Sequence, residues 1–185
     1  MKKNLLYFLM IVLLSSFLVS CNNREEKFKH LSFTIPFIFT SIDVVDVSQM
    51  TPDKFERHIK EDFYKIQTER TDEGIVTVYS LKPDFKFDLS EGERYDICAI
   101  YDFKHNPEEL TINTLAFKYT SPSSNDIEMF HNITMSQLEP LLTKWGFEKN
   151  ETLQKPNRIY YLKGEEEVVT IDKDDKEVVI SKFFR

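Results

Sequence analysis

Two segments of this chain repeat the same predicted order of helix and strands, and this repeat limits the folds that the chain can adopt. Residues 51–119 begin with an amphipathic helix and continue with three segments of strand character, and residues 134–184 follow the same order. A helix buries an apolar stripe and a sheet buries an apolar face, so each helix should pack against its strands. We therefore predict an α+β fold: two helix-plus-three-strand units, an antiparallel sheet, and both helices on one face.

The first helix is predicted to start at Thr51-Pro52-Asp53. These residues supply a cap, a proline suited to the first turn and an acidic side chain at the positive end of the helix dipole. Its apolar stripe consists of Phe55, Ile59, Phe63 and Ile66. The helix should therefore end between Ile66 and Glu69. The strand candidates that follow are Ile75–Leu81, Tyr95–Phe103 and Leu110–Tyr119.

The second helix is predicted from a capping-box pattern, Thr134 with Gln137. Pro140 disfavours a helix interior, and the alternative start for this helix is just before it. Gly146 followed by Phe147 is typical of a glycine-terminated helix with a hydrophobic contact after it. The strand candidates that follow are Arg158–Leu162, Val168–Ile171 and Val178–Phe184.

Residues 30–185 are predicted to form a single domain. The polar run at 121–126 is the clearest linker, and it joins pseudo-repeat units at 51–120 and 134–185. Before the first helix, the segment from His30 to Val47 alternates in a strand-like way and predicts an extra N-terminal strand. Pro36 favours an edge position or a break for that strand, because proline cannot donate to the sheet ladder.

Residues 1–20 have the pattern of a secretory signal peptide. Lys2 and Lys3 give a positive start, and residues 5–19 are apolar except for two serines. As a helix this stretch spans about 22 Å, which is short of the roughly 30 Å hydrocarbon core. A transmembrane anchor is therefore the weaker alternative.

The end of this segment, Leu18-Val19-Ser20-Cys21, resembles the lipobox of bacterial lipoproteins. The resemblance implies cleavage after Ser20, a diacylglyceryl thioether on Cys21, and acylation of the new amino group. Two or more acyl chains hold a protein firmly on a membrane. We therefore expect Cys21 to be the lipidation site, with the membrane as one partner of a bacterial cell-envelope protein. The alternative is a stray thiol after an ordinary signal peptide.

Residues 21–29 are polar and lack hydrophobic periodicity, so they are predicted to form a tether. Asn22 stands where an aspartate would signal inner-membrane retention in enterobacteria, which favours the outer membrane. The pair Glu25-Glu26 loosely resembles the export signal of surface lipoproteins in Bacteroidota, but a solvated charge run is the better explanation. The sequence leaves open whether the protein faces the periplasm or the cell surface.

Glycine and cysteine are scarce, which excludes several kinds of site. The four glycines are at least 18 residues apart, so dinucleotide-binding loops, Walker loops and nucleophile elbows are absent. Cys21 and Cys98 form no CxxC pair, which excludes zinc ribbons and thioredoxin-like motifs. A net charge of −7 makes nucleic acid a poor partner, because phosphate binding needs a clustered positive surface.

The remaining reactive side chains form no recognisable catalytic or metal-binding pattern. His30, His58, His105 and His131 have no short metal-ligand spacing. Cys98 in a predicted strand is better explained as a small core residue than as a nucleophile. The acidic run 172–177 lacks the turn glycine of a calcium loop, and carboxylate pairs are too frequent in this chain to indicate a glycosidase. We therefore expect no catalytic residue, metal or cofactor.

Tyr160 and Tyr161 are neighbours on a predicted strand, so their side chains point to opposite faces of the sheet. One of them should enter the core. The other is either covered by the N-terminal strand or exposed as part of a partner-binding surface.

The folded part is similar in outline to two groups of envelope proteins. Met135-Ser136-Gln137-Leu138, Tyr160-Tyr161 and the run 168–172 resemble the BamE/SmpA-type outer-membrane-assembly lipoproteins. The order of elements also resembles the tandem beta-lactamase-inhibitor-like fold. Both resemblances imply a non-enzymatic protein-binding module that binds another envelope protein or a foreign protein. The roles they suggest are envelope assembly, inhibition or immunity. An envelope hydrolase with a dispersed His and carboxylate site is the alternative.

Overall fold

The computed structural model of this protein describes residues 23–32, 35, 47–72, 74–82, 89–102, 110–165 and 167–184. A helix at residues 23–32, called the N-terminal helix below, comes first. The later helical elements are η1 (Val47–Gln49), α2 (Pro52–Ile59) and α3 (Ser124–Lys144). The strands are β1 (Phe63–Arg70), β2 (Gly74–Leu81), β3 (Arg94–Asp102), β4 (Thr111–Thr120), β5 (Glu148–Lys149), β6 (Arg158–Lys163), β7 (Glu167–Lys173) and β8 (Glu177–Phe184).

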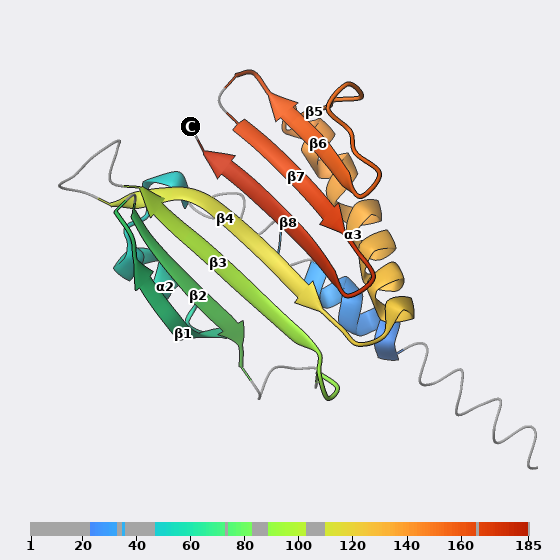
Figure 1. Cartoon of the computed structure of the whole chain (residues 1–185), viewed down its shortest axis with the longest axis horizontal. Coiled ribbons are helices and arrows are strands. Elements are labelled where there is room, and N and C mark those ends of the chain that lie inside the picture. The colour runs from blue at the N-terminus through green and yellow to red at the C-terminus, as the bar shows by residue number, and fades with distance from the viewer. Residues whose placement is uncertain are drawn as a thin grey trace, which may run out of the picture.

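The strands form one open, eight-stranded antiparallel sheet in the order β1-β2-β3-β4-β8-β7-β6-β5 (Figure 1). β4 and β8, the last strands of the two units, pair at its centre, with Thr114 opposite Phe183 and Thr120 opposite Glu177. The α+β class and the antiparallel sheet are thus confirmed. The repeat is also present, but α2 and α3 are each followed by four strands, so the prediction of three strands per unit was wrong.

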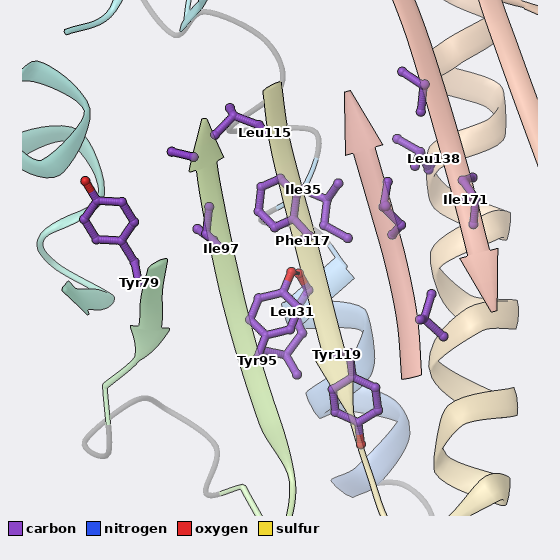
Figure 2. Packing of buried hydrophobic residues seen from close by; sticks show 14 of the residues in the cluster. Leu31, Ile35, Tyr79, Tyr95, Ile97, Leu115, Phe117, Tyr119, Leu138 and Ile171 are labelled. Atoms are coloured by element: carbon purple, nitrogen blue, oxygen red, sulfur yellow. Dashed lines mark hydrogen bonds between the residues drawn. The ribbon is translucent and has the colours of Figure 1, made fainter. Parts of the chain in front are cut away.

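The helices pack on one face of this sheet. Strand registers align one row of buried side chains across it: Tyr79, Ile97, Phe117, Ile180 and Ile171 (Figure 2). The ring of Phe55 in α2 lies 5.6 Å from that of Tyr79 at one end of this row. Nearer the middle, Phe130 of α3 and Phe28 of the N-terminal helix both contact Tyr119 of β4, at 4.5 and 5.5 Å between ring centroids. Side chains alternate along each strand, so the opposite face, called the open face below, carries the intervening residues.

The second helix is longer than its sequence pattern indicates. α3 begins at Ser124, inside the predicted linker, and the Ser123 hydroxyl accepts a 3.3 Å hydrogen bond from the Asp126 backbone N–H. Thr134 is therefore an interior residue, and its buried hydroxyl lies 2.8 Å from that of Ser32. Pro140 also lies within the helix. The local capping pattern at Thr134 was misleading, because Ser123, eleven residues earlier, caps the helix instead.

The end of α3 matches its prediction. Gly146 adopts φ 83°, which a residue without Cβ does at little cost. The Phe147 N–H then bonds the Leu142 carbonyl at 2.9 Å, and the Gly146 N–H bonds that of Thr143 at 3.1 Å. This pair of bonds is a Schellman motif, and the buried Phe147 ring supplies the hydrophobic contact that accompanies it.

The first helix is shorter than predicted. α2 ends at Ile59, and Phe63 starts β1, which pairs with β2. Phe63 is still buried, but from a strand, while Ile66 is 41% exposed at an irregularity in the register. The predicted helical stripe was wrong beyond Ile59, because backbone pairing with β2 outweighs the local periodicity.

The region before the first unit also differs from its prediction. Residues 23–32 are helical, so the predicted tether at 21–29 is wrong for its described part. Residues 30–32 and 35 are helical too, which contradicts the strand predicted there, and residues 33–34 and 36–46 lie outside the described residues. The physical reason is a stripe of three buried side chains at helical spacing: Phe28, Leu31 and Ile35.

Candidate functional site

Tyr160 and Tyr161 lie on opposite faces of β6. Tyr161 is 2% exposed beneath α3, and its hydroxyl donates a 2.9 Å hydrogen bond to Glu139. Burial and this hydrogen bond raise the pKa of Tyr161. Tyr160 is half-buried and points to the open face, where it lines a cleft of about 780 Å³. The structure therefore assigns a core role to Tyr161 and leaves Tyr160 accessible.

The cleft lies over the second unit and the central strand β4. Alternate residues of β6, β7 and β8 form much of its wall, with further residues from β4 and the turns between strands. Its lining residues are Asn113, Asn157, Arg158, Tyr160, Val168, Thr170, Asp172, Lys173, Asp174, Glu177, Val179, Ser181, Phe183 and Phe184. Among these lining residues, only Tyr160 was indicated as a possible partner contact by the sequence pattern. The alternation of β6, which carries Arg158, Tyr160 and Leu162 on one face, was the signal that could have found Arg158.

Small side chains form a low row across the open face. The strand registers place Cys98, Ala116, Ser181 and Thr170 side by side from β3 to β7. Val78 and Tyr160 stand at the two ends of this row. Such short side chains do not reach far above the backbone, so the taller residues at its ends and in the neighbouring rows surround a depression.

An apolar row borders the small one toward the C-terminal end of β8. It runs across Val76, Ile100, Thr114, Phe183, Val168 and Leu162. Phe183 is 37% exposed, an unusual position for a large aromatic ring on a central strand. This row gives the open face apolar area that water contacts in the isolated domain.

A charged group borders the small row on its other side. Arg158 forms an ion pair with Asp172, and its guanidinium carbon lies 5.9 Å from the Tyr160 ring centroid. Hydrogen bonds from its guanidinium to the Tyr160 hydroxyl and to Asp172 raise the pKa of Arg158. Arginine and tyrosine held in this way present a flat, partly charged surface beside the apolar row.

Cys98 lies on the open face but has the character of a packing residue. Its side chain is half-buried in β3, and burial raises the pKa of its thiol. A raised pKa keeps the thiol protonated, whereas a nucleophile must be a thiolate. The structure thus favours the structural interpretation of Cys98.

The other predicted candidates do not converge. His30, His58 and His131 lie in the N-terminal helix, α2 and α3, while His105 lies outside the described residues. The Asp174 side chain accepts bonds from the N–H groups of Lys176 and Glu177, at 2.7 and 2.8 Å, so the middle of the acidic run, residues 174–176, forms the β7–β8 turn. Among the described residues, no group of three or more His, Cys, Asp or Glu side chains is placed to hold a metal ion.

The signal peptide and Cys21 lie outside the described residues. Within the part of the chain that is described, no helix combines the length and apolar character needed to cross a bilayer. No known protein family, curated protein or solved structure matches this chain.

Proposed function

We propose that this chain is a lipid-anchored protein of the bacterial envelope that binds another protein through its open sheet face and performs no catalysis. The lipobox-like segment ending at Cys21 supports the anchor and favours the outer membrane. The cleft around Tyr160 supports the binding role. The resemblance to assembly lipoproteins and inhibitor-like folds is in keeping with both.

The observation that carries the binding role is that the adjacent tyrosines lie on opposite faces of the sheet, Tyr161 in the core and Tyr160 on the open face. Tyr161 has a structural role in the core, because its ring is buried and its hydroxyl donates a hydrogen bond to Glu139. Tyr160 has no such position beneath a helix, yet it is a large aromatic side chain held against Arg158. Tyrosine and arginine are the residue types enriched at the centres of protein interfaces.

The composition of the open face fits a protein partner better than a small substrate. A shallow depression floored by small side chains accepts a protruding element of another protein, and the apolar row with Phe183 supplies area to bury on contact. The ion pair of Arg158 with Asp172 adds polar groups at the border that fix orientation. The proposed roles are envelope assembly, or inhibition of a toxin or enzyme.

Site-specific photocrosslinking in the producing cell tests the binding role. A photoreactive residue at Tyr160 should give a discrete crosslinked species, while one at Leu153, which is exposed outside the cleft lining, serves as the control. The same species should weaken when Phe183→Ala is added. Equal crosslinking at both positions, or at neither, would contradict the proposed surface.

A separate experiment tests the anchor. Cys21→Ser should yield protein that incorporates no fatty acid and is not processed as a lipoprotein, as followed by metabolic labelling with a radioactive fatty acid. Labelling that persists in this variant would rule out Cys21 as the lipidation site.

A further inference from the structure

The N-terminal helix is an integral part of the folded core. Phe28 and Leu31 are fully buried, and Phe28 packs edge-on against Tyr119 and Phe130 at 5.5 and 5.9 Å between ring centroids. The Leu31 carbonyl accepts a 3.0 Å hydrogen bond from the Tyr95 hydroxyl. These contacts join residues 23–32 to β3, β4 and α3, so the segment does not behave as a free linker.

A buried ion pair fixes the helix further. Lys27 Nζ lies 2.8 Å from both carboxylate oxygens of Glu93, and the two side chains are 8% and 1% exposed. The Tyr119 hydroxyl donates to the same carboxylate at 2.6 Å, and the Ser90 backbone N–H donates to it as well. Detaching the N-terminal helix would remove the Lys27 countercharge and leave the Glu93 carboxylate buried without it, which costs free energy.

The direction of the helix is set by contacts along its length. Arg24, near its start, pairs with Asp126 in the first turn of α3 at 3.2 Å, while Ser32, near its end, contacts Thr134 further along α3. The chain therefore enters at the end of the domain where β4 leads into α3 (Figure 1). The β7–β8 turn lies at this same end, because Glu177 pairs with Thr120.

We propose that this end of the domain rests on the lipid bilayer, an inference that depends on the proposed lipidation of Cys21. Cys21 precedes Asn23, the first described residue of the N-terminal helix, by two positions, which span at most about 7 Å. With the helix fixed in the core, no long tether separates the acyl chains from the domain. The end that carries the β7–β8 turn is thereby held at the membrane surface.

The charges at this end indicate how it is held there. Glu91, Asp174 and Asp175 are exposed at this end, and so are the basic residues Arg24, Arg94 and Lys176. A clustered basic patch attracts anionic lipids, whereas a surface of mixed charge offers no such patch. The acyl chains hold this end at the bilayer, and the contact requires no anionic lipid.

The orientation also positions the open face. The strands run between the membrane end and the opposite end, which carries the β6–β7 turn with Gly164 and Glu165. The open face therefore stands upright from the bilayer rather than lying on it. A partner approaching along the membrane reaches the cleft from the side.

Quenching of a fluorescent label by nitroxide-headgroup lipids tests this orientation. The full lipidated chain, carrying Cys98→Ser, is labelled at Asp175→Cys or Glu165→Cys and reconstituted in phosphatidylcholine vesicles. We expect the label at position 175 to be quenched several-fold more strongly than the label at position 165. A flexible Gly/Ser insertion of about ten residues after Asn22 leaves the folded domain intact and should remove most of this difference.

The outcomes separate this inference from the proposed anchor. Protein that floats with the vesicles and shows equal quenching at both positions overturns the orientation alone. A difference that survives the inserted linker would also overturn it, because the short connection would then not be the cause. Protein that fails to float overturns the lipid anchor and, with it, the orientation.

Discussion

Lys27 and Glu93 are 66 residues apart in the chain and form a buried ion pair that joins the N-terminal helix to the start of β3. Each carboxylate oxygen of Glu93 lies 2.8 Å from the Lys27 ammonium. Neither residue follows a recognisable motif. This pair converts a polar N-terminal stretch into a structural element of the domain.

Lys27→Met should destabilise the protein strongly, because it leaves the Glu93 carboxylate buried without its countercharge. The expected loss is roughly 3–5 kcal/mol of unfolding free energy, measured by urea denaturation. Lys29→Met is the matched control, since Lys29 pairs with Glu25 at the exposed surface and should cost less than about 1 kcal/mol. Similar losses in the two variants would show that the buried pair has no special role.

The pH dependence of stability should change in Glu93→Gln. Burial by itself raises the pKa of Glu93, but hydrogen bonds from Lys27, Tyr119 and Ser90 outweigh it and hold that pKa below its usual value of 4.5. A carboxyl group with a lowered folded-state pKa stabilises the protein above its unfolded-state pKa, and this stability is lost as the pH falls through the folded-state value.

Unfolding free energies of wild type and Glu93→Gln should therefore differ most at neutral pH and converge as the pH falls below 4.5. Glu128 and Glu167, whose pKa values are also lowered, titrate in both proteins and cancel in the comparison. A difference between the two proteins that is independent of pH would contradict the assignment.

Alanine at the two adjacent tyrosines should have unequal effects on stability. Tyr161→Ala removes a buried ring and its bond to Glu139, at a cost of roughly 3–5 kcal/mol. Tyr160→Ala removes a half-buried ring on the open face and should lower the melting temperature much less. Tyr160→Ala should instead weaken the crosslinking given by a photoreactive residue at Phe183 in the same cleft, and equal destabilisation by both changes would argue against an accessible Tyr160.

The start of α3 can be tested by removing its cap. Ser123→Ala removes the acceptor for the Asp126 N–H and should cost about 1 kcal/mol of unfolding free energy. Ser136→Ala is the control, because Ser136 is exposed in the middle of α3 and its hydroxyl bonds only the nearby Ile133 carbonyl. A larger loss of unfolding free energy in Ser136→Ala than in Ser123→Ala would show that Ser123 is not the residue that caps α3.

Local patterns in the sequence determined several features of this protein. The alternation of β3, β4, β6 and β8 predicted their positions and that Tyr160 and Tyr161 point to opposite faces of the sheet. The pair Gly146-Phe147 predicted the end of α3, because a positive φ there needs glycine and the following ring packs back on the helix. Both depend on interactions within a few residues.

Tertiary contacts decided the rest, because they join residues that no local pattern relates. Phe63 suits a helical stripe as well as a strand, and pairing with Leu81 on β2 makes it the start of β1. Residues 23–32 look like a tether until Glu93 supplies a buried partner for Lys27 and Tyr119 a surface for Phe28. The cleft at Tyr160 likewise depends on the registers of β4, β8, β7 and β6, since only the assembled sheet brings Arg158, Ser181 and Phe183 to one face.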